Sequence, residues 1–359
     1  MQQTRLTAAR SICRKHRCTH LLVTAAGDIE YLSGFSASQA VLLIAPGRNV
    51  LFTDFRYQES ARRFCSANRV WKFVPVKGYG FSFLAPFVSP GSAVAFQSDA
   101  VTVDELKKLK KAVPHARFAG VPREISALGI VKTKAEATAM KRAARIAEAA
   151  FAQFLRRHLR PGITEREAAV MLDCTCAALG SERCAFDTIV LFGERTSLPH
   201  GRPGNSRLKR GDLVLADFGC TVAGLCSDIT RMAAWGGTPS QRQRELYAVV
   251  KRAQTASLRA ARPGITATAL DAAGRSIIRT AGYGHAFGHA IGHGVGRRVH
   301  ELPRVSSKSK EVLQEGTVIT LEPGIYLPGF GGVRIEDMVL LTRNGARLLT
   351  HSPEKLVVI

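Results

Sequence analysis

The sequence lacks the features of a membrane or secreted protein. It contains no uninterrupted apolar run of the roughly 18 residues that a membrane-spanning helix requires. The basic segment Met1–His20 has no apolar core region, so we expect it to be a basic amphipathic helix and not a secretory signal. The eight cysteines include no C-x-x-C pair and no regular spacing, so we expect reduced thiols, a cytoplasmic location and no membrane partner.

Several catalytic motifs are also absent. No G-x-S-x-G nucleophile elbow occurs and no cysteine lies beside a likely base, which disfavours a serine or cysteine hydrolase. Neither G-x-x-x-x-G-K-[ST] nor G-x-G-x-x-G is present around the glycine-rich segment 288–296, so no phosphate loop is predicted there. Between His289 and His293 the pattern is not H-E-x-x-H, because Ala290 replaces the glutamate, and the glycines disfavour a helix.

Acidic residues are scarce. The chain has 28 of them against 51 lysines and arginines, which gives a formal net charge of +23 and could attract a nucleic acid. The excess is spread out, with 18 basic and 8 acidic residues in 1–130 and 33 and 20 in 131–359. Because there is no basic tail and no interleaving with aromatic residues, we expect weak, salt-sensitive adhesion and no specific nucleic-acid partner.

The length of 359 residues suggests two domains. Residues 1–130 alternate short apolar runs with helical patterns, as α/β domains do. Strands are predicted at 20–24, 40–45, 50–53, 70–74 and 93–96, and helices at 4–15, 57–64 and 101–111. Pro122 and Gly129 mark a boundary, and an alanine- and arginine-rich run over 134–159 then predicts a long helix.

The second part of the chain contains two copies of one sequence frame. Residues 160–164 read Arg-Pro-Gly-Ile-Thr, and the same five residues recur at 262–266. A longer frame, Leu-x-x-Gly-x5-[Asp/Glu]-x-Gly, begins at Leu208 and again at Leu313, and both copies include an apolar run typical of a buried strand. We therefore expect two related halves that pair about a pseudo-two-fold axis.

Three histidines, His289, His293 and His300, lie in and just after the glycine-rich segment 288–296. Neutral imidazole is the commonest metal-binding side chain, and glycine lets the backbone approach a ligand closely. His300 also corresponds to His200 in the first half of the repeat. A histidine cluster alone is weak evidence for a metal site, so carboxylates are needed to complete it.

The repeat supplies these carboxylates in matching positions. Asp217 corresponds to Glu322 at the end of an apolar strand, and Asp228 corresponds to Glu336 further on. Four carboxylates that meet in a core would be untenable unless cations neutralise them. With His293 they would hold two divalent ions about 3.5–4 Å apart. The oxygen-rich set favours Mn²⁺, although Co²⁺ and Zn²⁺ also fit.

The chain resembles metallopeptidases of the creatinase/aminopeptidase ("pita-bread") fold, in the Xaa-Pro dipeptidase and aminopeptidase P branch. The resemblance covers nearly the whole chain. It rests on 198–201, 217–219, 226–231, 289–303, 322–326 and 333–337 and, less specifically, on 31–35 and 52–57. It implies an α/β (α+β) fold with a creatinase-like N-terminal domain over 1–123 and a pseudo-two-fold pita-bread catalytic domain over 130–359.

The resemblance also implies the metal ligands. They would be Asp217, Asp228, His293, Glu322 and Glu336. Asp228 and Glu336 would bridge the two ions, and a bridging hydroxide would attack the scissile carbonyl.

The remaining site residues are implied in the same way. Glu322 would accept and donate the proton, and His200 or His300 would stabilise the oxyanion. His289, His200 and His300 would line the substrate pocket, and Arg334 would orient a bridging carboxylate. The implied substrates are Xaa-Pro peptides, and the implied assembly is a homodimer.

Other functions are also compatible with this fold. A methionine-aminopeptidase-like or other aminopeptidase specificity shares the five ligands, but it does not account for the first domain. Creatinase-type amidinohydrolases share both domains, but they do without the metal ligands. A non-catalytic relative that binds nucleic acid or protein would be expected to have lost ligands, and none of the five is missing.

One departure from the family pattern follows Gly296, where Arg297 and Arg298 replace the usual apolar residue. An arginine there could recognise the carboxylate of a dipeptide. The preferred interpretation is that both side chains point to solvent or to a partner chain.

Overall fold

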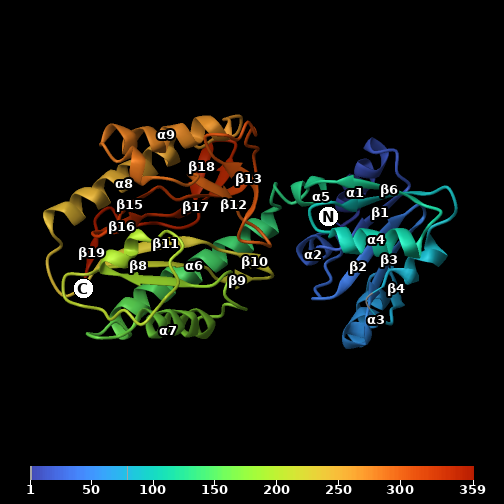
Figure 1. Cartoon of the computed structure of the whole chain (residues 1–359), viewed down its shortest axis with the longest axis horizontal. Helices are drawn as coiled ribbons and strands as arrows, with labels where there is room; N and C mark the ends of the chain where they lie inside the picture. Colours follow the sequence, from blue (N-terminus) through green and yellow to red (C-terminus); the bar gives the residue numbers. More distant parts are fainter. Residues whose placement is uncertain (1, 79) are drawn as a thin grey trace. The chain divides into compact units, whose positions relative to one another are not determined.

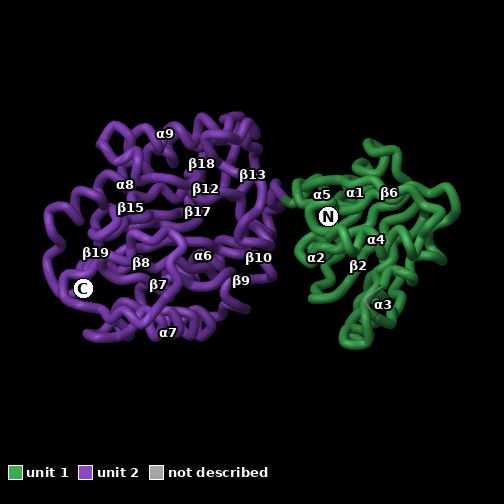
Figure 2. The backbone as a smooth tube through the Cα atoms, viewed as in Figure 1, with its two compact units in different colours: residues 1–129 green, residues 130–359 purple. Residues whose placement is uncertain are grey.

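The computed structural model describes residues 2–78 and 80–359. The chain forms two compact units, unit 1 up to residue 129 and unit 2 from residue 130 to residue 359 (Figures 1 and 2). None of the described helices is both long enough and apolar enough to span a membrane.

Unit 1 is a six-stranded sheet with helices on both faces. Its helices are α1 (Gln2–Lys15), α2 (Ala26–Ser33), α3 (Gln58–Ala67), α4 (Val103–Ala112) and α5 (Glu124–Ala127), with 3₁₀ turns η1 (Phe55–Tyr57) and η2 (Ser82–Phe87). Its strands are β1 (His20–Val23), β2 (Ala40–Ala45), β3 (Arg48–Thr53), β4 (Lys72–Pro75), β5 (Ala93–Gln97) and β6 (Arg117–Val121). The strand order is β4-β3-β2-β1-β5-β6, and β2 alone runs antiparallel to its neighbours.

Strand β1 shows how the sheet is buried on both sides. Leu21 and Val23 belong to a core cluster with residues of α1 and α2, whereas Leu22 belongs to a second cluster with residues of α4. Successive side chains on a strand point to opposite faces, so this apolar run fits a strand that is covered twice.

The predicted strands and helices of this domain are all present, with ends shifted by a few residues. The predicted start of α4 is confirmed, because the Thr102 side chain accepts a hydrogen bond from Glu105 N within a capping box. The sequence patterns did not indicate α2 or β6. Helix α2 is short and has no side-chain cap, and β6 is only partly buried and contains Gly120.

Unit 2 contains two larger sheets and four long helices. The helices are α6 (Lys134–Arg157), α7 (Glu165–Ala178), α8 (Gln241–Ala260) and α9 (Ala267–Thr280), with 3₁₀ turns η3 (Gly193–Ser197) and η4 (Gly284–Ala286). The first sheet has the order β19 (Val357–Val358), β11 (Ile229–Ala234), β8 (Leu213–Phe218), β7 (Ile189–Phe192). The second has the order β13 (Glu301–Val305), β12 (Gly292–Gly294), β14 (Val318–Leu321), β17 (Asp337–Thr342), β18 (Gly345–Leu348). Two short hairpins pair β9 (Thr221–Val222) with β10 (Leu225–Cys226) and β15 (Gly324–Leu327) with β16 (Gly331–Arg334).

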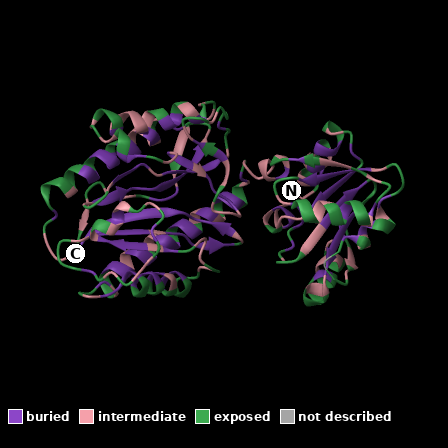
Figure 3. Cartoon of the chain, in the orientation of Figure 1, coloured by how far each residue is buried: buried purple, intermediate pink, exposed green. Residues whose placement is uncertain are grey.

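The helices lie on the outside of this unit, and the strands between them are buried (Figures 1 and 3). One core cluster joins α6 and α7 to β7, β8 and β11. Another joins α8 and α9 to β14 and β17 of the second sheet and also includes residues of β8 and β11 from the first. Each half of unit 2 therefore has a sheet covered by its own pair of helices.

The two copies of the sequence frame are structurally equivalent. In the first copy Gly162 N donates to Leu208 O at 3.0 Å, and in the second copy Gly264 N donates to Leu313 O at 2.8 Å. Both glycines have a positive φ, 75° and 85°, which explains why glycine occupies this position twice. The prediction of two related halves is confirmed.

Candidate metal centre

The first half brings two carboxylates to the same end of a pair of antiparallel strands. Asp217 lies near the end of β8, and Asp228 lies directly before β11, which pairs with β8. The chain returns between them through the small hairpin of β9 and β10, whose turn holds Ala223 and Gly224 at positive φ. The opposite partner of Asp217 in the ladder is Thr230.

The second half repeats this arrangement. Glu322 directly follows β14, Glu336 directly precedes β17, and these strands pair with Leu321 opposite Asp337. A backbone hydrogen bond from Glu336 N to Thr230 O, 3.3 Å, joins the second half to the first. All four carboxylates therefore come from strand ends that the repeat relates to one another.

His293 reaches this cluster from β12. Its Nε2 atom lies 3.5 Å from Asp228 Oδ2 and 3.4 Å from Glu322 Oε1. No side chain fits at the two positions beside His293. A Cβ atom at Gly292 would overlap the Thr320 carbonyl, and one at Gly294 would overlap the Leu302 carbonyl. The ladder with β13 is also irregular between His293 and Gly294, a feature that can redirect a side chain.

The donor set fits divalent cations. Ligand atoms of Asp228, His293 and Glu336 all lie within 4.8 Å of one another. Asp217 Oδ1 is buried and has no hydrogen-bond partner, although such atoms are normally satisfied. A cation at this cluster would give that oxygen a partner, and carboxylate and imidazole donors suit Mn²⁺, Co²⁺ or Zn²⁺.

The electrostatics of the cluster support the same conclusion. Burial, reinforced by the charges of neighbouring carboxylates, raises the pKa values of Asp228 and Glu336 well above their usual range. Burial also raises the pKa of Glu322 to about 8 and lowers that of His293 to about 4, so the imidazole is neutral. Protein groups alone thus leave these acids poorly stabilised in their ionised form, which bound cations would correct.

Arg334 is the buried cation that opposes these pKa shifts. Its Nη2 atom donates to Asp217 Oδ2, and its Nε atom donates to Thr230 Oγ1 at 2.9 Å. Thr230 Oγ1 in turn donates to Glu336 Oε2 at 2.7 Å. The family resemblance implies that Arg334 orients a bridging carboxylate, and this role stays a prediction. In the structure Arg334 bonds directly to Asp217 and reaches Glu336 through Thr230.

The three predicted substrate-pocket histidines lie in one neighbourhood. His289 Nε2 is 2.8 Å from Tyr326 Oη, and burial lowers the pKa of His289 to about 4. The exposed His300 ring lies nearly edge-on to His293, with centroids 4.4 Å apart. His200 is exposed after η3, and its charge contributes to lowering the pKa values of both His289 and His300.

Arg297 does not have the environment expected for it. Its side chain is 15% exposed and lies 3.5 Å from Glu136 at the beginning of α6, and its backbone oxygen contacts Cys226 Sγ. The expectation that the Arg297 side chain points to solvent is therefore wrong, whereas contact with a partner chain stays a prediction. Arg298 is partly exposed, and its backbone N–H donates to Glu301 Oε1 at 3.1 Å.

Sequence reasoning singled out neither Thr230 nor Tyr326. Tyr326 Oη lies 2.9 Å from Arg334 Nη1 and contacts His289, so it connects the guanidinium to the histidine. Both residues carry a hydroxyl inside a buried strand, and a buried hydroxyl needs a partner. A hydroxyl within an apolar strand segment is therefore the sequence feature that could have pointed to Thr230 and Tyr326.

Comparison with known families matches both parts of the chain. Residues 138–343 match the metallopeptidase family M24, and residues 5–131 match the creatinase/prolidase N-terminal domain.

Relatives and solved structures agree with these matches. The chain is 45% identical over 240 residues to a Xaa-Pro dipeptidase of Pyrococcus furiosus, covering 67% of this chain and 68% of the relative. The structure of a Xaa-Pro dipeptidase from Bacillus anthracis superposes with a TM-score of 0.94 at 34% identity, covering 100% of both chains. That of an X-Pro aminopeptidase from Thermotoga maritima gives 0.86 at 35% identity, covering 96% of this chain and 100% of the other.

Proposed function

The chain belongs to metallopeptidase family M24, and on this premise we propose that it is an exopeptidase that hydrolyses Xaa-Pro peptide bonds with two divalent metal ions. The proposed ligands are Asp217, Asp228, His293, Glu322 and Glu336. The observation that carries the proposal is the convergence of four strand-end carboxylates and one neutral imidazole, with Asp217 Oδ1 buried and unpartnered.

Bound cations would supply a Lewis acid for the scissile carbonyl and a lower pKa for the attacking water. The protein groups would move the proton and hold the substrate. Glu322, whose Oε1 lies 3.4 Å from His293 Nε2, would take the proton from water and return it to the leaving nitrogen. His200 or His300 would donate a hydrogen bond to the carbonyl oxygen as charge develops on it.

Specificity for proline would come from the histidine-lined pocket. A peptide bond to proline is tertiary and has no N–H, so a site for it must recognise the ring instead. His289 is held by Tyr326 on one side and stacks edge-on against Phe287 on the other, with centroids 4.9 Å apart. We propose that this fixed imidazole forms one wall of the proline pocket, beside His300.

The remaining assignments are also proposals. We favour Mn²⁺ as the native ion, with Co²⁺ or Zn²⁺ as alternatives, because four of the five donors are carboxylates. We also favour a homodimer and a cytoplasmic location. Light scattering after size-exclusion chromatography would test the homodimer, and cell fractionation would test the location.

The central experiment measures hydrolysis by the Mn²⁺-loaded full-length protein. The substrates are Ala-Pro and a longer Ala-Pro-Xaa peptide, and the variants are Glu322→Gln and Glu315→Gln. Glu315 is an exposed acid in the same segment, so it controls for loss of charge. We expect hydrolysis by the wild type and by Glu315→Gln, with a loss of roughly 100-fold or more in Glu322→Gln.

Two outcomes separate the subtypes. Cleavage of Ala-Pro alone indicates a dipeptidase, and cleavage of the longer peptide indicates an aminopeptidase. Failure of the metal-loaded wild type on both peptides contradicts the proposal. Retention of RNA at about 200 mM salt in a gel-shift assay would instead favour the alternative that the protein is a non-catalytic relative that binds nucleic acid.

A further inference from the structure

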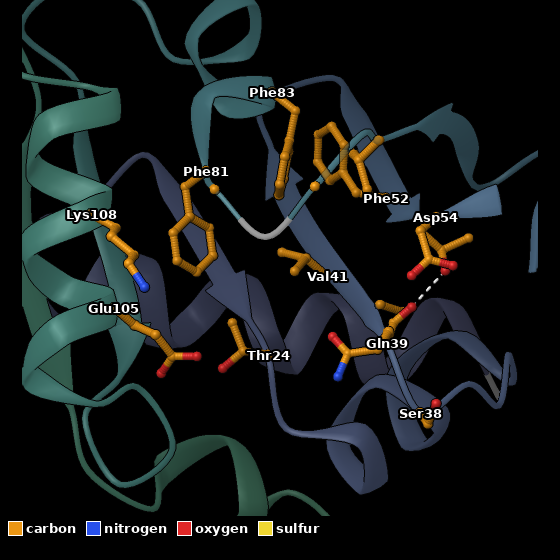
Figure 4. Close-up of a pocket in the computed structure, with 15 residues that line it drawn as sticks. Thr24, Ser38, Gln39, Val41, Phe52, Asp54, Phe81, Phe83, Glu105 and Lys108 are labelled. Carbon is orange, nitrogen blue, oxygen red and sulfur yellow. Dashed lines mark hydrogen bonds between the residues drawn. The ribbon is translucent and has the colours of Figure 1, made fainter. Parts of the chain in front are cut away.

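Unit 1 contains a hollow of about 350 Å³ that the proposed peptidase activity does not use (Figure 4). It lies where strands β1, β3 and β4 end: Thr24 follows β1, Thr53 ends β3 and Val76 follows β4. These three strands run in the same direction, because β3 is parallel to β4 and both β1 and β3 are antiparallel to β2. The carboxyl ends of parallel strands in open α/β sheets are the usual place for a ligand.

One wall of the hollow is aromatic and aliphatic, and polar side chains make up much of the remaining lining. The ring centroids of Phe52 and Phe83 lie 4.7 Å apart, and those of Phe81 and Phe83 lie 6.0 Å apart. Val41 and Val76 complete the apolar lining. Such a surface would contact one apolar side chain or ring, and the volume lies near the lower limit of small-molecule pockets.

Polar groups lie at both ends of this apolar wall. Figure 4 shows Thr24, Glu105 and Lys108 together on the side away from Ser38, Gln39 and Asp54. Thr24 Oγ1 is buried and has no hydrogen-bond partner, although its backbone N–H is held by Gln97 Oε1 at 2.9 Å. A ligand atom beside Thr24 would satisfy this hydroxyl.

Glu105 and Lys108 supply opposite charges at the same end. Glu105 uses its Oε2 atom in the capping box with Thr102, which leaves Oε1 for a ligand. The Lys108 ammonium pairs with Asp104 at 2.7 Å, but both side chains are more than half exposed, so this ion pair is weak and Lys108 can exchange it for a ligand carboxylate. The acid and the base are three residues apart on α4, so their side chains are neighbours on one face of the helix.

We propose that this hollow binds a free α-amino acid with an apolar side chain. The ammonium group would meet Glu105, the carboxylate would meet Lys108 and the Thr24 hydroxyl, and the side chain would lie against Phe52, Phe81 and Phe83. All of these groups belong to unit 1, so the site does not depend on the metal centre.

Isothermal titration calorimetry of the metal-loaded full-length protein tests this proposal with three probes. L-phenylalanine has both charged groups, phenethylamine has only the ammonium group, and 3-phenylpropionate has only the carboxylate. We expect L-phenylalanine to bind, and each single-charge probe to bind roughly fivefold more weakly or worse.

Three variants locate the binding. Lys108→Met and Thr24→Val remove polar groups of the hollow, whereas Lys107→Met removes an exposed charge from the same helix outside it. We expect the first two to weaken L-phenylalanine binding by roughly fivefold or more, the third to leave it unchanged, and all three to keep wild-type peptide hydrolysis and unfolding temperature. Absence of L-phenylalanine binding, equal binding by Lys108→Met and Lys107→Met, or undiminished binding of phenethylamine each overturns the proposal.

Discussion

Arg334 donates a hydrogen bond to one carboxylate oxygen of Asp217, while the other oxygen of Asp217 is buried without any hydrogen-bond partner. The guanidinium therefore fixes the orientation of the carboxylate and leaves one oxygen for a cation. Arg334 also donates to Thr230 at 2.9 Å, to Tyr326 at 2.9 Å and to the Pro199 carbonyl at 3.2 Å, so four neighbours, including Asp217, fix its position. This arrangement indicates that Arg334 acts on the metal centre through Asp217.

Arg334→Lys should therefore weaken metal binding while keeping the positive charge. Lysine cannot reproduce the fork of donors that reaches Asp217, Thr230 and Tyr326 together. Loss of such a supporting group typically costs 10- to 100-fold in metal affinity, and we expect a loss of about that size. Calorimetric titration with Mn²⁺ measures it, and Arg343→Lys on the exposed surface serves as the control. Equal affinities of the two variants would contradict the role assigned to Arg334.

Thr230→Val should disrupt the link between Arg334 and Glu336. The valine has nearly the same shape but leaves both charged groups without the hydroxyl that now connects them. We expect the free energy of unfolding to fall by about 1–3 kcal/mol. Thr221→Val is the matched control, because the Thr221 hydroxyl is buried without a partner and its removal should be neutral or stabilising. Urea denaturation of both variants measures the difference, and an equal loss in both would rule out a special role for Thr230.

Gly294→Ala should damage the histidine segment, whereas Gly288→Ala should not. A Cβ atom at Gly294 would overlap the Leu302 carbonyl, and no atom lies within 4 Å of a Cβ atom built at Gly288. Overpacking costs about 1–3 kcal/mol, and here any relief must move His293. We expect Gly294→Ala to unfold at a lower temperature and to lose Mn²⁺ affinity. A wild-type melting temperature for Gly294→Ala would show that the strand adapts freely.

Stability of the metal-free protein should fall as pH rises. Burial raises the pKa of Glu322 to about 8, and it raises the pKa values of Asp228 and Glu336 as well. In the unfolded chain these groups titrate near 4, roughly their ordinary value. Between about pH 6.5 and pH 8, above the ordinary pKa of histidine, the folded protein thus binds more protons than the unfolded chain, so the free energy of unfolding decreases with pH. At lower pH the lowered pKa values of His289 and His293 oppose this trend.

Bound Mn²⁺ should flatten this dependence, because cations stabilise the ionised carboxylates. Urea denaturation at about pH 6.5 and pH 8, with and without Mn²⁺, measures both slopes. Glu322→Gln should reduce the slope of the metal-free protein. A metal-free protein that is more stable at the higher pH would contradict the burial of these acids.

The positions of the four carboxylates could be predicted from the sequence because the repeat links each of them to a strand end. Asp217 and Glu322 share one frame, and a frame that recurs after an apolar run fixes which end of the strand carries the acid. The placement of His293 also followed once its segment was compared with a known family. These features depend on local patterns and on duplication.

The partners of Arg334 and Arg297 could not be predicted in the same way. Arg334 reaches Asp217 on β8 from β16, a strand of a different sheet, and Arg297 reaches Glu136 on α6, far away in the sequence. Such contacts are set by the packing of separate elements, which sequence periodicity does not encode. The same reason explains why the hydroxyls of Thr230 and Tyr326 were overlooked.

The hydrogen bond from Glu336 N to Thr230 O crosses the boundary between the two halves of unit 2, which also share a hydrophobic core cluster. Neither half alone holds more than two of the carboxylates, so a cation at the centre would add a second link between the halves beside this shared core. Chelation should therefore speed amide hydrogen exchange at Glu336 before it affects amides inside β8 or β14. On this view the metal is also a structural link that holds the strand ends of the two halves together.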